Sequence, residues 1–157
     1  MCRKPGETSG RNKLHVRRDS EVPAQLVAAY ETAEYRVEVE PPIVLSIGEA
    51  SAALVDLLAA RGLFLCAFIT ACNPSGQLLA AEENVRRTEA LERDLLDFAP
   101  EILPARGVDP TGSWPDEPGF LALGCPQKVF EVLGRRHGQN ALVLCGADGV
   151  PHLVLLR

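Results

Sequence analysis

The sequence predicts an α+β domain in which about four helices pack on a mixed β-sheet of about six to seven strands. Apolar residues make up 46% of the 157 residues, which is typical of a globular protein. Segments with helical periodicity alternate with short apolar runs. Some of these runs follow one another as hairpins and others are separated by a helix. Antiparallel and parallel pairs are therefore both expected in the sheet.

The first half of the chain predicts a helix, a hairpin, a second helix and a buried strand. Pro41 and Pro42 separate the two hairpin strands, and Gly62 is a natural C-terminal stop for the second helix. Residues 63–71 are continuously apolar without alternation, which favours a central strand covered on both faces. The expected elements are a helix over 20–33, strands over 35–39 and 43–47, a helix over 50–61 and a strand over 63–71.

The second half begins with Asn73-Pro74-Ser75-Gly76, whose residue order predicts a type I turn. Pro126 is expected at the first position of a helix that Gly138 ends. The remaining elements are expected as a helix over 79–98, a strand over 101–106, a long loop over 107–118, a strand over 120–123 and a hairpin of strands over 141–145 and 150–156.

The N-terminus differs in charge from the rest of the chain. Residues 1–18 contain six Lys or Arg and one Glu, whereas the remainder contains ten basic and twenty acidic residues. We therefore expect a basic, disordered tail over 1–19 and one globular domain over 20–157. The tail could alternatively contact nucleic acid, although the acidic remainder disfavours broad binding to phosphates.

Composition also limits the location and the metal chemistry. No apolar run reaches the ~18 residues of a membrane span, and the N-terminus lacks the apolar region of a secretory signal, so a cytoplasmic location is expected. The five cysteines are widely spaced without a C-x-x-C pair, and no metal site is predicted. Cys72, Cys125 and Cys145 each follow or end a predicted strand. They either converge, if those strands run parallel, or are small buried hydrophobic residues.

Two polar residues interrupt the apolar arc of the helix over 79–98. Asn84 falls inside this arc and Arg87 lies at its edge, both facing the sheet and the Asn73 turn. One interpretation is a ligand pocket at the end of the central strand, lined by Asn73, Asn84 and Arg87, with Arg87 holding an anionic group. The other is structural: Asn84 ties down the turn, and Arg87 pairs with Glu83 or with an acidic residue of the loop.

The long loop places Trp114 beside Asp116 and Glu117, which suggests a lid over the same pocket. Glu117 is the one candidate for a catalytic residue, as a general base if its pKa is raised. Trp114 could equally anchor the loop by burial. Gln139 follows the Gly138 stop and is placed near the pocket. His137 is expected to complement the helix dipole and not to bind metal.

Four blocks of the chain form a pattern in order and spacing: Phe68-Ile69-Thr70-Ala71-x-Asn73-Pro74, Asn84-x-x-Arg87-x-x-x-Leu91, Gly112-x-Trp114-x-x-Glu117 and Gly138-Gln139-x-Ala141. This pattern, across about residues 25–157, resembles domain-of-unknown-function family 3293, a family of short bacterial proteins. The resemblance supports a shared site that includes Trp114, Glu117 and Gln139. It implies no activity or cofactor.

The sequence therefore predicts a protein of unknown function that binds a small polar or anionic ligand through Asn73, Asn84, Arg87, Trp114, Glu117 and Gln139. Two alternatives remain open. One is a non-enzymatic interaction module in which the polar cluster is structural, and the other is nucleic-acid contact through the basic tail. No reaction, cofactor or oligomeric state is indicated.

Overall fold

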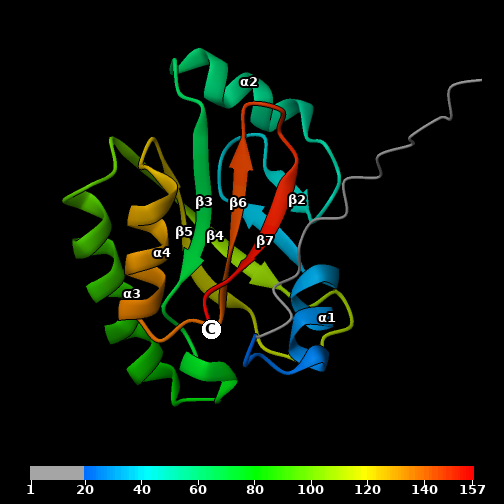
Figure 1. Ribbon diagram of the computed structural model, residues 1–157, viewed down its shortest axis with the longest axis vertical. Coiled ribbons are helices and arrows are strands. Elements are labelled where there is room, and N and C mark those ends of the chain that lie inside the picture. The colour runs from blue at the N-terminus through cyan, green and yellow to red at the C-terminus, as the bar shows by residue number, and fades with distance from the viewer. Residues whose placement is uncertain (1–19) are drawn as a thin grey trace, which may run out of the picture.

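A computed structural model describes residues 20–157, which form a seven-stranded sheet with four α-helices (Figure 1). The expected α+β class and the order of the elements are confirmed. The basic segment over 1–19, with its predicted disorder and its predicted contact with nucleic acid, lies outside the described residues.

The elements are mostly shorter than the sequence predicts. They are α1 (Ala24–Thr32), β1 (Glu34–Val37), β2 (Ile43–Ser46), α2 (Ala52–Ala60), β3 (Leu65–Thr70), the 3-10 turn η1 (Pro74–Gly76), α3 (Ala81–Leu96), β4 (Glu101–Val108), β5 (Glu117–Leu123), α4 (Gln127–Arg136), β6 (Ala141–Gly146) and β7 (Pro151–Leu155). Helix α1 begins one residue after Pro23 and has no side-chain cap; the Ser20 hydroxyl instead donates to the Arg157 carbonyl oxygen at 2.7 Å. Ser51 does cap α2, accepting a hydrogen bond from the Leu54 N–H at 3.2 Å.

The strand order is β2-β1-β4-β5-β3-β6-β7, and all six pairings are antiparallel. The parallel pairs expected from the helical crossovers are not formed. The reason is that each such crossover spans another strand. Helix α3 connects β3 to β4 across β5, and α4 connects β5 to β6 across β3. Strands joined by these helices run in the same direction without being neighbours.

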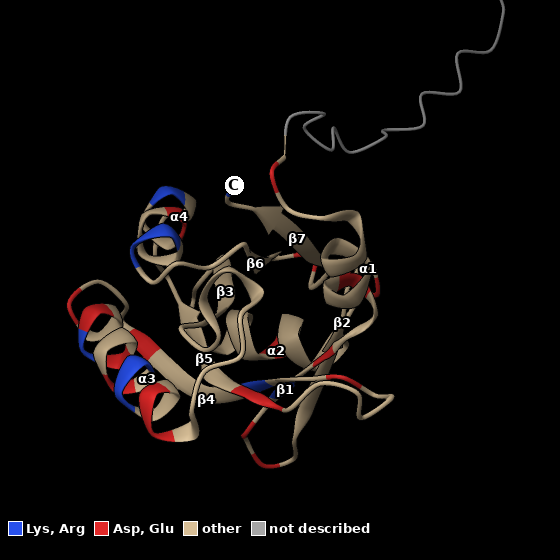
Figure 2. Ribbon diagram, turned by 90° about the horizontal axis from the view of Figure 1, so that it is seen from below, with Lys and Arg blue, Asp and Glu red and all other residues tan. Residues whose placement is uncertain are grey.

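The sheet curls around one core and carries a second core on its outer face. Cys66 and Phe68 of β3 face the inner core with Leu54 and Leu58 of α2, whereas Ile69 faces the outer core. The outer core holds buried side chains of α3 and α4. Figure 2 shows α3 and α4 together on one side of the sheet and α1 on the other. Residues 66–71 are all buried, which confirms that β3 is covered on both faces.

The turn after β3 is not of type I. Asn73 has φ 48° and Ser75 has φ 56°, and a type I turn requires negative φ at its third residue, here Ser75. The left-handed region is uncommon for residues other than glycine, and asparagine tolerates it better than most. The turn is therefore fixed by contacts elsewhere and not by its own sequence pattern alone.

The predicted long loop is partly strand. Strand β4 extends to Val108 and β5 begins at Glu117, with Gly107 and Glu117 as register partners. The connection that remains covers residues 109–116. The proline- and glycine-rich composition of 107–118 concealed this pairing, because such residues are depleted in strands.

The cysteines do not converge as a group of three. Cys145 of β6 is the register partner of Cys66 at the start of β3. Cys125 lies shortly after Leu123, which is the register partner of Cys66 in β5. Cys72 lies beyond the opposite end of β3, roughly 20 Å away at the usual rise of a strand. All four described cysteines are buried free thiols. Within residues 20–157 no helix is long and apolar enough to cross a membrane.

Neighbouring leucines on α3 provide a test of the outer core. Leu95 is fully buried, whereas Leu96 is 61% exposed. Leu95→Ala should lower the free energy of unfolding by about 2–5 kcal/mol because it leaves a cavity. Leu96→Ala should change it by less than about 0.5 kcal/mol. Denaturant unfolding of both variants measures this, and equal losses would contradict the described packing.

Candidate functional site

Three segments that are distant in sequence meet at one end of the sheet. The end of β3 lies beside the start of β5, with Thr70 opposite Gly119, and beside the start of β6, which pairs through Phe68 and Val143. Because these pairings are antiparallel, the last residues of β3 meet the first residues of both neighbours. The predicted site residues from the turn, the loop and the Gly138 region are thereby brought together.

The Asn73 side chain is the centre of this meeting point. Its Oδ1 accepts hydrogen bonds from the Leu79 N–H and from Asn84 Nδ2, both at 2.9 Å. Its Nδ2 donates to Glu117 Oε1 at 2.8 Å. The Asn73 backbone N–H donates to Asn84 Oδ1 at 3.0 Å. The predicted contact of Asn84 with the turn is therefore formed, and it supports the left-handed backbone of Asn73.

Arg87 binds backbone carbonyl groups and none of the acidic residues that were predicted as its partners. Its Nε donates to the Ala71 carbonyl oxygen at 3.1 Å, and its Nη2 donates to that of His137 at 3.4 Å. Gln139 Nε2 donates to the carbonyl oxygens of Cys72 and His137, at 3.1 and 3.2 Å. These two side chains tie the end of β3 to the connection between α4 and β6.

The turn and the α4–β6 connection also touch directly. The Ser75 N–H donates to the Gly138 carbonyl oxygen at 2.9 Å. Gly138 has φ 70°, and a Cβ at this position would lie 2.8 Å from Cβ of Pro74. A glycine is required here both by the backbone conformation and by the close approach.

A cavity of about 410 Å³ opens on the inner side of this end of the sheet. It is bounded by α1, the sheet and the 109–116 loop, and a volume of this order is typical of small-molecule sites. Of the six predicted site residues, Asn73, Trp114, Glu117 and Gln139 line it, whereas Asn84 and Arg87 do not. Its other walls include Leu26, Tyr30, Tyr35, Phe68, Thr70, Val108, Asn140, Val143 and Leu153.

Sequence reasoning missed Tyr30, Tyr35 and Asn140 as lining residues. Tyr35 alternates with polar neighbours in β1, which indicates an inward side chain but not the cavity it reaches. In the structure its hydroxyl donates to the Tyr30 carbonyl oxygen at 2.6 Å, and Asn140 Nδ2 donates to the Tyr30 hydroxyl at 3.1 Å. The contact between Asn140 and Tyr30 joins residues 110 positions apart, which no local pattern reveals.

Glu117 is the half-buried acidic group of the cavity. Its Oε1 accepts hydrogen bonds from Asn73 Nδ2 at 2.8 Å and from Trp114 Nε1 at 3.0 Å. Burial raises the pKa of Glu117 above its ordinary value, and these two hydrogen bonds only partly oppose the shift. Within residues 20–157 no side chain or backbone group donates to its Oε2. Such a carboxylate can bind a cation or accept a proton from a bound molecule.

The 109–116 loop is organised by Asp109. Its carboxylate accepts hydrogen bonds from the N–H groups of Thr111, Ser113 and Trp114, at 2.9, 3.1 and 3.1 Å. These bonds fold the loop back on itself and place Trp114 against Glu117. The hydrogen bonds also lower the pKa of Asp109, those with Thr111 contributing most.

The charged side chains that line the cavity are acidic. Glu117 and Asp109 line it, and its described lining contains no Lys, Arg or His. In Figure 2 most of the Lys and Arg segments lie on α3 and α4, on the far side of the sheet from α1. With Arg87 bound to carbonyl groups, the cavity offers no cationic side chain of the described residues to the anionic ligand that the sequence suggested.

A second cavity of about 420 Å³ lies on the other side of Asn73. Asn84, Cys72 and Thr88 line it together with apolar residues of α3. The thiol of Cys72 lies 3.6 Å from the Thr88 hydroxyl and 3.5 Å from the Pro118 carbonyl oxygen. Asn73 is thus a wall shared by both cavities, and Asn84 borders only the second.

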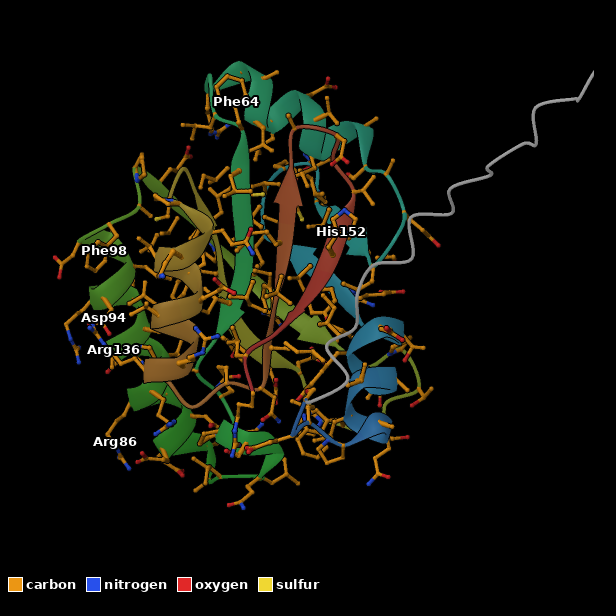
Figure 3. The ribbon with its side chains drawn as sticks, in the orientation of Figure 1. Phe64, Arg86, Asp94, Phe98, Arg136 and His152 are labelled. Atoms are coloured by element: carbon orange, nitrogen blue, oxygen red, sulfur yellow. The ribbon has the colours of Figure 1, made fainter. Side chains whose placement is uncertain are left out.

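His137 contacts Asp94, which also forms an ion pair with Arg136, outside both cavities. Its Nε2 lies 2.7 Å from Asp94 Oδ2, and Arg136 Nη1 lies 3.5 Å from the same oxygen. Figure 3 shows Asp94 and Arg136 next to each other beside α3. Among residues 20–157 no group of three or more His, Cys, Asp or Glu side chains is placed to hold a metal ion.

A family match covers most of this site. The matching family is described as a protein of unknown function (DUF3293), and the match covers residues 69–142. The predicted family resemblance is confirmed. The DUF3293 match includes all six predicted site residues and excludes Tyr30, Tyr35 and Phe68 of the cavity wall. No curated protein and no solved structure matches the chain.

Asn73→Asp tests the hydrogen bond to Glu117. The variant retains an acceptor oxygen for Leu79 and Asn84 but places a second carboxylate against Glu117. We expect a loss of about 1–3 kcal/mol in the free energy of unfolding at pH 7, the usual cost of an unsatisfied buried polar contact. Chemical denaturation measures the loss.

The double variant Asn73→Asp with Glu117→Gln is the matched control. The glutamine amide can donate to the new carboxylate, so most of the lost stability should return. If the double variant is instead as unstable as the sum of both single changes, the contact between these two side chains does not contribute as described.

Glu117→Gln tests the raised pKa through the pH dependence of stability. A carboxyl whose pKa is raised on folding lowers the free energy of unfolding when it is ionised. This cost is absent at low pH, where the group is protonated in both states, and it develops as pH rises from the unfolded pKa through the folded pKa. Glu117→Gln lacks this cost. The stability of the variant relative to the parent should therefore increase as pH rises from 4 to 8. Unfolding curves across this range measure it, and a relative decrease would show that the pKa is lowered.

Proposed function

We propose that the protein binds a small molecule in the cavity beside α1, with Glu117 recognising the polar end of that molecule. The observation that carries this proposal is the half-buried carboxylate that projects into a largely apolar cavity of about 410 Å³. A few placed polar groups within apolar walls are the usual composition of a small-molecule site.

The polar groups of the cavity are held by hydrogen bonds that leave some of their oxygen atoms available to a ligand. Asn73 and Trp114 both donate to one oxygen of Glu117. Gln139 donates through Nε2 to two carbonyl groups, and its amide oxygen accepts no bond from residues 20–157. The cavity therefore presents acceptor oxygens, which favour a ligand that donates hydrogen bonds.

Arg87 and Asn84 have a positioning role in this proposal. Both hold the Asn73 turn and the adjoining carbonyl groups, which are the structural contacts expected under the interaction-module alternative. That alternative leaves the cavity without a role. The acidic lining also argues against the anionic ligand, since a buried carboxylate repels one.

The four described cysteines bear on the location of the protein. They are all free and buried. Free thiols persist in reducing compartments, and this supports the cytoplasmic location expected from the sequence.

Two alanines on α1 provide a matched test of ligand binding. Both alanines are exposed, but Ala29 lines the cavity and Ala28 does not. Ala29→Trp should fill the cavity, and Ala28→Trp should add the same side chain to the solvent-facing surface. The probes are a panel of small alcohols, amines and carboxylic acids with four to eight carbon atoms. A probe at 100 times its Kd adds about 2.7 kcal/mol to stability.

We expect at least one probe to raise the Tm of the parent protein and of Ala28→Trp but not that of Ala29→Trp. Thermal unfolding monitored by circular dichroism measures this shift. If no probe raises the Tm of the parent, or if Ala29→Trp responds as strongly as Ala28→Trp, the cavity is not a binding site for molecules of this kind.

A further inference from the structure

We propose that the cavity recognises an alkylammonium group, held by the Glu117 carboxylate and by a surrounding set of aromatic rings. This inference rests on the proposed binding function and specifies its ligand class. The aromatic set consists of Tyr30, Tyr35, Phe68 and Trp114, all of which line the cavity.

The aromatic residues of the chain are concentrated at this cavity. The chain has one Trp, two Tyr and five Phe, and the cavity takes the Trp, both Tyr and one Phe. Phe64 and Phe98 are exposed at separate places, near α2 and at the end of α3 (Figure 3). Phe120 and Phe130 lie in the outer core. The gathering at the cavity is therefore not a general feature of the apolar interior.

The rings come from four different segments and line the same cavity as Glu117. Tyr30 lies on α1, Tyr35 on β1, Phe68 on β3 and Trp114 in the 109–116 loop. The ring centroids of Tyr35 and Phe68 are 5.1 Å apart. Trp114 Nε1 is 3.0 Å from Glu117 Oε1. The negative charge of Glu117 contributes to raising the pKa of both Tyr30 and Tyr35, after burial, which places it within electrostatic reach of both rings.

This combination suits a cation with alkyl substituents. The faces of aromatic rings attract a cation through their quadrupoles, and aromatic cages are a recurring way to bind quaternary ammonium groups. A carboxylate supplies the opposite charge, while the apolar walls accommodate the methyl or methylene groups. No Lys, Arg or His of the described residues lines the cavity to compete for Glu117. Asp109, the other acidic residue of the wall, has its carboxylate oxygens bound by the loop.

The test compares three probes of nearly the same shape and different charge. Choline carries a trimethylammonium group, 3,3-dimethylbutan-1-ol is its neutral counterpart, and 3,3-dimethylbutanoate is an anionic one. Isothermal titration calorimetry of residues 1–157 measures the Kd of each. We expect choline to bind at least about tenfold more tightly than the neutral alcohol, and the anion to bind most weakly.

Two variants show whether Glu117 causes this preference. Glu117→Gln removes the carboxylate charge while retaining the acceptor oxygen, and it should reduce the ratio of the two Kd values to about one to three. Asp116→Asn removes a neighbouring charge that does not line this cavity, and it should leave the ratio unchanged. Circular dichroism establishes that both variants are folded before titration.

The outcomes separate this inference from the proposed function. If the neutral alcohol binds the parent as tightly as choline, or if Glu117→Gln retains the preference, the alkylammonium assignment is wrong and the cavity still binds small molecules. If none of the three probes binds and the wider panel also fails to raise the Tm, the proposed binding function is wrong and the inference falls with it.

Discussion

The arrangement of the site depends on the side-chain amide of Asn73. This residue lies in the left-handed backbone region three residues beyond the end of β3, where a non-glycine residue needs external support. Its amide supplies that support by joining the N-terminal part of α3 through Asn84 to the first residue of β5, Glu117. Loss of this amide leaves the turn, the helix and the carboxylate without a common partner.

The topology explains why one amide can reach so many elements. Crossovers that skip a strand place β3 between β5 and β6, so that three segments distant in sequence meet at the same end of the sheet. Arg87 on the outer side and Gln139 at the cavity wall donate to the carbonyl groups left free where β3 ends. On the inner side, the small side chains of Ala29 in α1 and of Ala33 directly after it line the cavity.

Part of this arrangement could be predicted from the sequence, and the rest could not, for identifiable reasons. The angular position of Asn84 correctly predicted a contact with the turn, because a buried amide must find partners nearby. The position of Arg87 on the helix correctly indicated the direction of its side chain. It did not indicate that backbone carbonyl groups would take the guanidinium donors, so binding of an anionic ligand by Arg87 is not supported. Tyr30 and Tyr35 were missed because their place in the cavity depends on long-range strand order. The mixed sheet was expected because helical crossovers do not reveal whether the joined strands are neighbours.

The central claim is that Asn73 and Trp114 hold Glu117 as a half-buried carboxylate facing the cavity. The most direct measurement is an NMR titration of the Glu117 carboxyl carbon, with the Asn73 side-chain amide signals followed in parallel. The account predicts a pKa above the ordinary value of about 4.3 for glutamic acid, with the Asn73 amide signals shifting at the same midpoint. A pKa at or below that value, or Asn73 signals that do not respond, would contradict it.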